Sequence, residues 1–205
     1  MKALVLAAGL GERMHLNSPD IDLETHINDV VNLILFEDLH DIVLTGHSYG
    51  GMVITGVADR IADASRLSHL VYLDAMVPLP GESWSSSHTA ETRALRQRAI
   101  AEQGALPPPD PAIFGLAGDD AAWVARRQTP QPGGVYDAPL HFDATRVERW
   151  PRSFIDCTEP ALATIAVSRQ RVRVQPGWRV LELPTGHDAM VSAPQALAGR
   201  LLALA

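Results

Sequence analysis

The residues best suited to chemistry in this sequence are a serine and a histidine that lie far apart along the chain. Ser48 stands in GHSYG (46–50), a Gly-x-Ser-x-Gly pattern that follows the apolar run DIVLT and precedes a helical pattern. In a sharp turn between a strand and a helix, such a serine exposes its Oγ at the carboxyl end of a sheet, and the flanking glycines let strand and helix approach closely. The pattern predicts a serine nucleophile.

A serine of this kind needs a base to remove its proton, and in strand-turn-helix sites the base comes last in chain order. His187 lies in LPTGHDAM, after the apolar run Trp178–Leu183 and before the final helical pattern. We therefore expect His187 to be the base. The other histidines precede the serine, flank it, begin a strand or lie in a Pro-rich segment: His15, His26, His40, His47, His69, His88 and His141.

Two carboxylates compete for the task of aligning the imidazole of His187 and stabilising its charged form. Glu159, in FIDCTEP, follows the expected strand Arg152–Cys157. Asp74, in VYLDAMVP, ends the strand that comes after the serine turn. We favour Glu159 and keep Asp74 as the alternative; the carboxylate that does not contact the histidine is then a solvated or helix-capping group.

The surroundings of the serine predict how a substrate would be held. A helix N-terminus favours negative charge, and the N–H of Tyr49 is expected to point where an oxyanion would form. Large apolar side chains are candidates for an apolar substrate pocket, although core packing explains them equally well. These candidates are Met76, Trp84, Phe114, Trp123 and Met190.

The elements that must position these residues alternate between apolar runs of strand length and helical patterns. Ile27, Val30, Val31 and Ile34, for example, recur on one face of a helix. This alternation predicts an α/β fold with a mostly parallel sheet flanked by helices. The expected strands are Lys2–Ala7, Asp41–Thr45, His69–Leu73, Arg152–Cys157 and Trp178–Leu183.

The segment from Pro78 to Pro151 differs from the rest because it holds most of the prolines, including PPPDP at 107–111. Short helical stretches interrupt it near Glu91–Gln103 and Asp119–Gln128. We expect a cap-like insertion that packs over the sheet within a single domain spanning residues 1–205. Long insertions of this kind usually serve function.

Composition narrows the class of protein. A chain of 205 residues that is 46% hydrophobic and 20% charged is typical of a globular domain. The net charge of −7 argues against a nucleic-acid partner. Cys157 is the only cysteine, which fits a reducing compartment, and MKALVLAAGL is too short for a membrane span. We expect a cytoplasmic protein with no membrane partner.

Four stretches give the chain a resemblance to a known family: GLGERMHL, the segment from DIDLETHIN to GHSYGGMVITGVADRI, HLVYLDAMVP and LPTGHDAMVSAP. Together they resemble small bacterial α/β-hydrolase esterases, similar to pyrethroid-type carboxylesterases and more distantly to plant methylesterases and hydroxynitrile lyases. The resemblance implies a serine, acid and histidine triad with neither metal nor organic cofactor, and a cap over an apolar pocket. It assigns the nucleophile to Ser48, the base to His187 and the acid to Glu159, where relatives more often have Asp.

The opening LVLAAGLGERM has a second interpretation, the phosphate-cradling loop of a nucleotidyltransferase. That chemistry needs a lysine soon after the Gly-rich turn, and Lys2 is the only lysine in the chain. We therefore assign GLGER to the hydrolase resemblance.

The resemblance also implies several strands before the nucleophile and a loop with a second oxyanion donor. Only 47 residues precede Ser48, so we expect the first strands of the fold to be missing. Our hypothesis is that Lys2–Ala7 pairs beside Asp41–Thr45 and that the Ala8–Gly11 loop supplies the second N–H. The edge left by a shortened sheet favours a homodimer through the N-terminal strand.

We predict a serine esterase that cleaves a carboxylic ester of a hydrophobic small molecule through an acyl-enzyme on Ser48. One alternative is a lyase or cyclase that uses His187 as a base without an acyl-enzyme. The other is a binding protein whose catalysis is impaired by the short N-terminus. The sequence identifies neither the substrate nor the oligomeric state.

Overall fold

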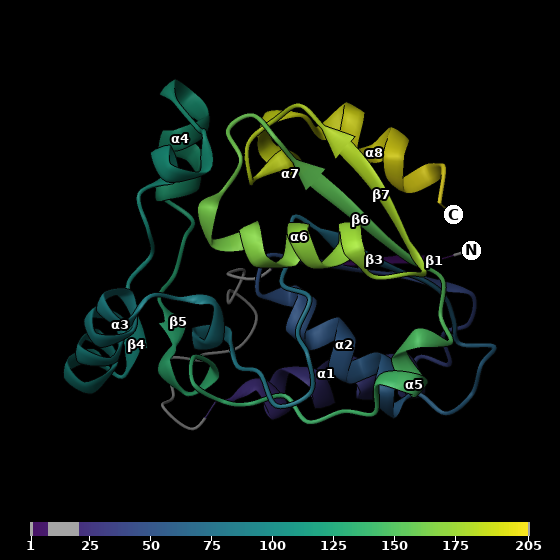
Figure 1. Cartoon of the computed structure of the whole chain (residues 1–205). Coiled ribbons are helices and arrows are strands. Elements are labelled where there is room, and N and C mark those ends of the chain that lie inside the picture. The colour runs from purple at the N-terminus through teal and green to yellow at the C-terminus, as the bar shows by residue number, and fades with distance from the viewer. Residues whose placement is uncertain (1, 8–20, 205) are drawn as a thin grey trace.

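The computed structural model describes residues 2–7 and 21–204 of the chain (Figure 1). Its strands and helices alternate through most of the sequence, as the apolar pattern predicts. The strands are β1 Lys2–Ala7, β2 Ile42–His47, β3 Leu67–Leu73, β4 Ala105–Leu106, β5 Gln131–Pro132, β6 Arg152–Cys157 and β7 Trp178–Leu183. The helices are α1 Leu23–Phe36, α2 Gly50–Arg60, α3 Ala90–Gln103, α4 Gly118–Ala125, α5 Ala144–Glu148, α6 Ala166–Val174, α7 Ala189–Ser192 and α8 Pro194–Leu202.

Five of the strands form one parallel sheet in the order β1-β2-β3-β6-β7. The expected pairing of the first strand is confirmed, since Lys2 aligns with Ile42 and Ala7 with His47. Parallel strands place their carboxyl ends at one edge of the sheet, and in α/β folds that edge carries the site. The ends of β2, β3, β6 and β7 therefore bring segments from four distant parts of the sequence together.

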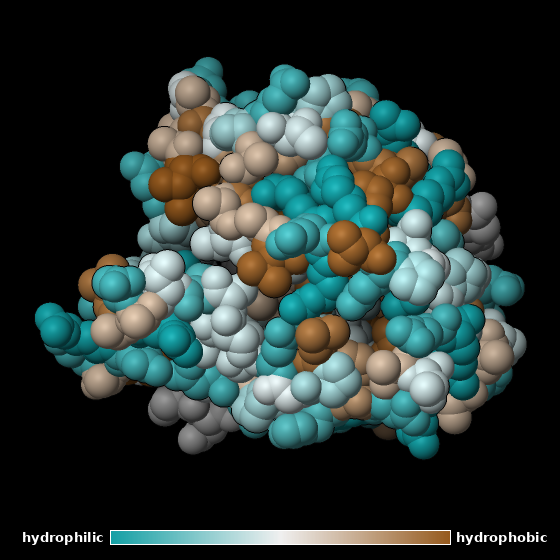
Figure 2. Space-filling model, viewed as in Figure 1, coloured by the Kyte–Doolittle hydropathy of each residue, from teal (hydrophilic) through white to brown (hydrophobic). Residues whose placement is uncertain are grey.

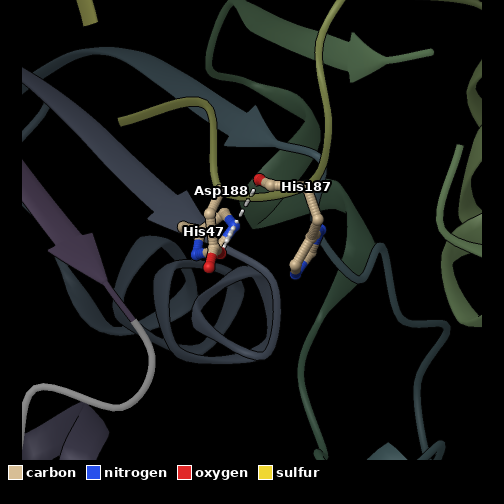
Figure 3. Close-up of side chains that lie close together, drawn as sticks. All are labelled: His47, His187 and Asp188. Carbon is tan, nitrogen blue, oxygen red and sulfur yellow. Dashed lines mark hydrogen bonds and ion pairs between the residues drawn. The ribbon is translucent and has the colours of Figure 1, made fainter. Parts of the chain in front are cut away.

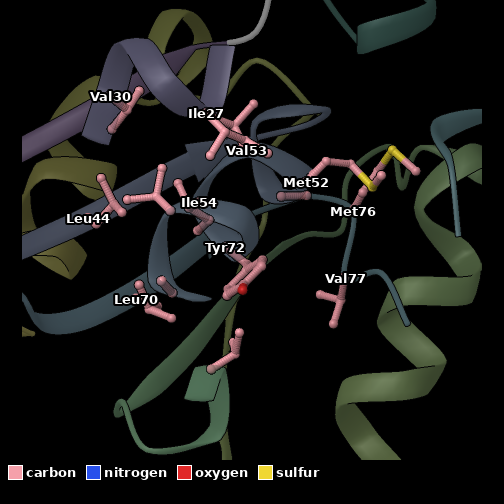
Figure 4. Packing of buried hydrophobic residues seen from close by; sticks show 14 of the residues in the cluster. Ile27, Val30, Leu44, Met52, Val53, Ile54, Leu70, Tyr72, Met76 and Val77 are labelled. Atoms are coloured by element: carbon pink, nitrogen blue, oxygen red, sulfur yellow. The ribbon is translucent and has the colours of Figure 1, made fainter. Parts of the chain in front are cut away.

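Alternating side chains of the strands pack on opposite faces of the sheet. Leu44, Leu70 and Tyr72 join a cluster with side chains of α1 and α2 (Figure 4), whereas Val43 and Val71 join a second cluster with α7 and α8. This is the two-residue period of a β-strand whose two faces are both covered by helices. Figure 1 shows α1 and α2 on one side of the molecule and α7 and α8 on the other.

Helix α1 follows from local signals in the sequence. The Asp22 carboxylate accepts a hydrogen bond from the Thr25 N–H at 2.8 Å and caps the helix start. The face of the helix predicted to be apolar turns toward the core, with Ile27, Val30 and Ile34 buried. Capping and a buried apolar stripe together explain why this segment is a helix.

The Pro-rich segment lies between β3 and β6 and contains α3, α4 and α5 and the antiparallel pair β4-β5. Part of it belongs to the main core, because Val135, Leu140, Val147 and Trp150 are buried in the α1/α2 cluster. Its other part carries α3 and α4, which lie to one side of the sheet in Figure 1. The insertion thus shares the core of the sheet at one end and extends outward at the other.

The surface seen in Figure 2 mixes hydrophilic and hydrophobic side chains, and it is notched between the regions of α3 and α4. Several large apolar side chains of the insertion are exposed, including Ile113 and Trp123. None of the helices described between residues 21 and 204 is long and apolar enough to cross a membrane.

Candidate active site

The serine predicted to be the nucleophile lies in the turn between β2 and α2. Ser48 has a φ of 55°, a left-handed conformation that non-glycine residues rarely adopt. Such strain persists only where the surroundings impose it, and it is characteristic of a nucleophile on a strand-to-helix turn. Ser48 is half-buried, while the residues on either side of it are buried. The turn therefore leaves access to one side chain.

Two glycines make this turn possible. A Cβ atom at Gly46 would overlap the backbone of Gly50, where the strand and the helix meet. A Cβ atom at Gly51 would overlap the backbone of Met76, on the segment that follows β3. The glycine requirement predicted for the position two before the serine is confirmed at Gly46, and Gly51 adds a second close approach.

Backbone hydrogen bonds fix the turn against the end of β3. The Ser48 N–H donates to the Leu73 carbonyl at 3.3 Å, and the Met76 N–H donates to the Ser48 carbonyl at 2.9 Å. Both partners flank Asp74, so the serine and this aspartate are positioned by the same short stretch of backbone.

Tyr49 is the N-cap residue of α2, and the first N–H groups of a helix have no acceptor within the helix. Its N–H therefore lies at the helix start, and its role as an oxyanion donor stays a prediction. The Tyr49 ring is buried, with its hydroxyl 3.3 Å from His26 Nδ1 and its centroid 5.4 Å from that of Trp84. The contacts of the Tyr49 side chain hold the turn in place, while its backbone forms the start of α2.

His187 lies on the loop between β7 and α7 and is only 2% exposed. The insertion holds this loop: the His187 N–H donates to the Phe114 carbonyl at 3.1 Å, and a Cβ at Gly186 would overlap the same carbonyl. The Phe114 ring lies 5.1 Å from the imidazole, centroid to centroid. The insertion therefore contributes to the position of the expected base.

The carboxylate next to His187 is Asp74, the alternative in the sequence analysis. The Nδ1–H of His187 donates to Asp74 Oδ2 at 2.7 Å, and Asp74 is fully buried. Because a carboxylate can only accept, this bond leaves Nε2 of a neutral imidazole free to take up a proton. Asp74 has a φ of 38°, so the strand end itself turns sharply where the carboxylate is presented.

Glu159, the acid preferred from the sequence, is not the carboxylate that contacts His187 in the structure. Glu159 lies in the loop after β6, where its N–H donates to the Thr185 carbonyl at 2.9 Å. Glu159 is exposed, and its side chain forms no hydrogen bond with any of the described residues. Asp74, at the end of β3, contacts the imidazole, whereas Glu159, after the end of β6, is exposed to solvent.

Arg169 of α6 binds the other oxygen of the same carboxylate. Its Nη2 donates to Asp74 Oδ1 at 2.6 Å, and its Nε donates to Asp156 Oδ1 at 2.5 Å. Arg173 then donates to Asp156 Oδ2 at 2.6 Å. A buried charged network thus runs from the imidazole through two aspartates to the surface.

His47 links the nucleophile turn to the histidine loop (Figure 3). Its Nε2–H donates to the His187 carbonyl at 3.0 Å and lies 3.8 Å from Asp188 Oδ1. The rings of His47 and His187 are 4.4 Å apart between centroids. The bonded partner of His47 is 140 residues away along the chain, so this bond joins two distant segments.

Burial controls the ionisation of these groups. Burial, followed by the positive charge of Arg169, lowers the pKa of His187 from 6.5 to about 3. Burial raises the pKa of Asp74 to about 6, opposed by the charge of Arg169. Burial also lowers the pKa of His47 to about 3. At neutral pH both histidines are therefore neutral and Asp74 is ionised.

Of the two hydrogen bonds expected in a triad, the structure shows the one between Asp74 and His187. Among the described residues Ser48 Oγ forms no hydrogen bond with His187. The Met76 N–H bond to the Ser48 carbonyl and the bond from the His47 side chain to the His187 carbonyl nevertheless hold the two segments beside each other. In unliganded active sites the bond between nucleophile and base is often long and tightens when substrate binds. The arrangement has a preformed acid–base pair and an accessible, strained serine.

The candidate pocket residues fall into two groups. Met76 and Trp84 pack near the serine turn, and Phe114 packs on His187. Trp123 and Met190 instead line an open cleft of about 430 Å³ between α4 and α7. The remaining lining residues of this cleft are Asp119, Asp120, Ala122, Arg126 and Val191.

Two expectations extend beyond these observations. The Ala8–Gly11 loop, expected to supply a second oxyanion donor, lies outside the described residues. For a metal ion, the described residues offer one cluster of suitable type, in which ligand atoms of His47, His187 and Asp188 lie within 4.8 Å of one another. His47 Nε2 already donates to a carbonyl there, which leaves that nitrogen without a lone pair for a metal.

Comparison with known proteins supports the resemblance seen in the sequence. Residues 4–200 match the model of an alpha/beta hydrolase family. A relative from Nocardioides sp. (strain SG-4G), named carbendazim hydrolyzing esterase, is 39% identical over 208 residues, which cover 96% of this chain and 84% of the relative. The match with an esterase excludes the nucleotidyltransferase interpretation of the opening segment.

Solved structures show the same fold. An extracellular alpha/beta-hydrolase from a Paenibacillus species superposes with a TM-score of 0.76 at 23% identity, covering 90% of this chain and 80% of that one. A pyrethroid hydrolase from Sphingobium faniae superposes with a TM-score of 0.66 at 22% identity, covering 94% and 80% respectively.

Proposed function

Because the chain belongs to the alpha/beta hydrolase family and is an esterase-type enzyme, we propose that it cleaves a carboxylic ester of a hydrophobic small molecule through an acyl-enzyme on Ser48. The observation that carries the proposal is the 2.7 Å bond from His187 Nδ1 to the buried Asp74, next to a serine in a strained turn. An imidazole fixed in this tautomer has a lone pair on Nε2, which can accept a proton and return it.

In the first half of the reaction, His187 Nε2 takes the proton from Ser48 Oγ while Oγ attacks the acyl carbon. Asp74 stabilises the imidazolium that forms. The tetrahedral intermediate collapses when the bond to the leaving alkoxide breaks, and the imidazolium gives its proton to that oxygen. The alcohol departs and the acyl group stays on Ser48.

Water completes the cycle. His187 takes a proton from the water, whose oxygen attacks the acyl carbon, and the proton then passes to Ser48 Oγ as the ester bond to the enzyme breaks. The Tyr49 N–H at the start of α2 stabilises the oxyanion of both tetrahedral intermediates. A single donor of this kind is worth roughly 10²–10³ in rate.

The preference for a hydrophobic substrate rests on the side chains around the reacting groups. Phe114 packs on His187, and Trp84 packs on Tyr49. A wall of aromatic rings favours apolar or aromatic groups in the ester. The Nocardioides relative's name supports this class, and carbendazim belongs among the first compounds to test.

The test is to detect the acyl-enzyme directly. A 4-nitrophenyl ester should give a burst of nitrophenolate equal to the enzyme concentration if deacylation is the slower step. A 4-nitrophenyl phosphonate should leave a stable adduct on Ser48, located by peptide mass spectrometry. Ser48→Ala should give neither. Turnover of the ester with no adduct and no dependence on Ser48 would favour a base-only mechanism through His187.

A further inference from the structure

Arg169 on α6 is the charged group that contacts the expected acid on the side away from the imidazole. Among residues 2–7 and 21–204, each carboxylate oxygen of Asp74 has one side-chain partner: Oδ2 accepts from His187 Nδ1 at 2.7 Å, and Oδ1 accepts from Arg169 Nη2 at 2.6 Å. A carboxylate fastened at both oxygens cannot rotate about its Cβ–Cγ bond without breaking one of them. The orientation that the histidine needs is therefore defined by the arginine.

The guanidinium is itself held on every side. Besides Asp74, it donates from Nε to Asp156 Oδ1 at 2.5 Å, from Nη1 to the Leu162 carbonyl at 2.5 Å and from Nη2 to the Cys157 carbonyl at 3.2 Å. These acceptors belong to the end of β6 and the loop after it. A planar fork with several fixed donors is what distinguishes arginine from lysine at such a site.

Charge adds a second reason for an arginine here. The side chains of Asp74 and Asp156 are 0% and 2% exposed, and two buried carboxylates facing each other repel. One guanidinium lies between them, and Arg173 offsets the remaining charge on Asp156. In the described part of the chain, the charged or titratable groups that face Asp74 are Arg169, His187, His47, Asp156, Asp188 and Cys157.

We propose that Arg169 is a positioning residue for the reaction: by holding Oδ1 of Asp74, it aims Oδ2 at His187. The proposal rests on the proposed function of Ser48 and His187 but concerns a residue that touches neither the substrate nor the reacting atoms. A positioning role differs from a purely structural role of α6, because the effect of Arg169 on the reaction must pass through Asp74.

The first experiment measures kcat and KM of Arg169→Lys across pH. The lysine keeps a positive charge but loses the fork, so we expect kcat to fall about 10- to 100-fold, as expected for a slightly misplaced catalytic group, while KM changes less than about threefold. Arg169→Gln also removes the charge that lowers the pKa of both Asp74 and His187. Its acidic limb of kcat/KM should therefore move to higher pH.

The matched control is Arg171→Lys on the same helix. Arg171 pairs with Glu82 at 2.8 Å, a pair with no contact to Asp74. This variant should keep the wild-type kcat and pH profile. An equal loss of kcat in both variants would show that any damage to α6 has the same consequence, and it would overturn the proposal.

Two further readouts separate this proposal from the proposed function. In an Asp74→Asn background, Arg169→Lys should cause no additional loss of kcat, since its effect passes through Asp74; additive losses would refute it. Histidine NMR needs no turnover, and Arg169→Gln should raise the pKa of the His187 imidazole in the folded protein. An unchanged His187 titration would contradict the role of Arg169 even if Ser48 proves to be the nucleophile, and a changed titration would support it even if Ser48 does not.

Discussion

Replacing Asp74 by asparagine tests the geometry of the acid most sharply. The two oxygens of Asp74 face two donors, His187 Nδ1 at 2.7 Å and Arg169 Nη2 at 2.6 Å. An asparagine has one carbonyl oxygen and one NH₂ group, so one of these donors must face another donor. Arg169 cannot give up its protons, and the carbonyl oxygen is therefore expected to turn toward it.

The NH₂ group of the substituted side chain would then face His187 Nδ1 and favour the imidazole tautomer with its proton on Nε2. That tautomer cannot accept the proton of Ser48. In a serine protease triad the same change lowers kcat by about 10⁴, and we expect a loss of roughly 10³–10⁴ for Asp74→Asn on the same ground. Glu159→Gln, at an exposed residue, should change kcat less than about threefold.

The assay is the hydrolysis of 4-nitrophenyl butyrate by both variants, with kcat and KM measured at about pH 8, where the wild-type Asp74 is ionised. Circular dichroism and the Tm of each variant check that it is folded. A large loss in Glu159→Gln together with near wild-type activity in Asp74→Asn would refute the assignment of the acid, and with it the account of Arg169.

Three other results follow from the structure. The kcat/KM of the wild-type enzyme should fall as the pH drops through about 6, because Asp74 with its raised pKa takes up a proton and His187 loses its ionised partner; a profile that stays flat from neutral pH to well below this value would contradict this. Gly46→Ala should lower the free energy of unfolding in urea by about 3 kcal/mol or more, since its Cβ overlaps the Gly50 backbone, and a stability equal to wild type would be inconsistent with the turn. Trp123 is 46% exposed, so Trp123→Ala should change the free energy of unfolding by less than about 1 kcal/mol. If the cleft takes part in binding, the same variant should raise KM for a naphthyl ester more than KM for vinyl acetate. An equal change in KM for the two esters would exclude that role.

Local patterns were enough to predict the sheet and to propose Ser48 and His187 as site residues. The strands are continuous apolar runs, and the glycines around Ser48 mark a turn that few other backbones need. His187 could be chosen because chain order and the position after the last strand exclude the other histidines. The strands, the serine turn and the place of His187 after the last strand all follow from residues that are close together in the sequence.

The acid could not be predicted in the same way. Asp74 and Glu159 both follow strands that end at the same edge of the sheet. The choice depends on how each strand end turns, and the positive φ of Asp74 that aims its carboxylate has no glycine to announce it. Tertiary geometry alone distinguishes the two carboxylates.

Arg169 was missed although one signal for it was present. Asp156 lies within a strand whose neighbours are apolar, and a buried carboxylate needs a cation. The segment SRQRVRV offers Arg169, Arg171 and Arg173 as partners. The sequence does not indicate which of these arginines turns inward, because α6 is a short helix that spans only Ala166–Val174.

Labelling with a fluorophosphonate probe tests the central claim most directly. The probe reacts only with a serine that a neighbouring base activates, so we expect stoichiometric labelling of the wild-type protein at Ser48 and none in Ser48→Ala. His187→Ala should be labelled at least about 10²-fold more slowly, the lower end of what a general base contributes. A folded wild-type protein that is not labelled, or one labelled equally well without His187, would contradict the assignment of Ser48 and His187 as nucleophile and base.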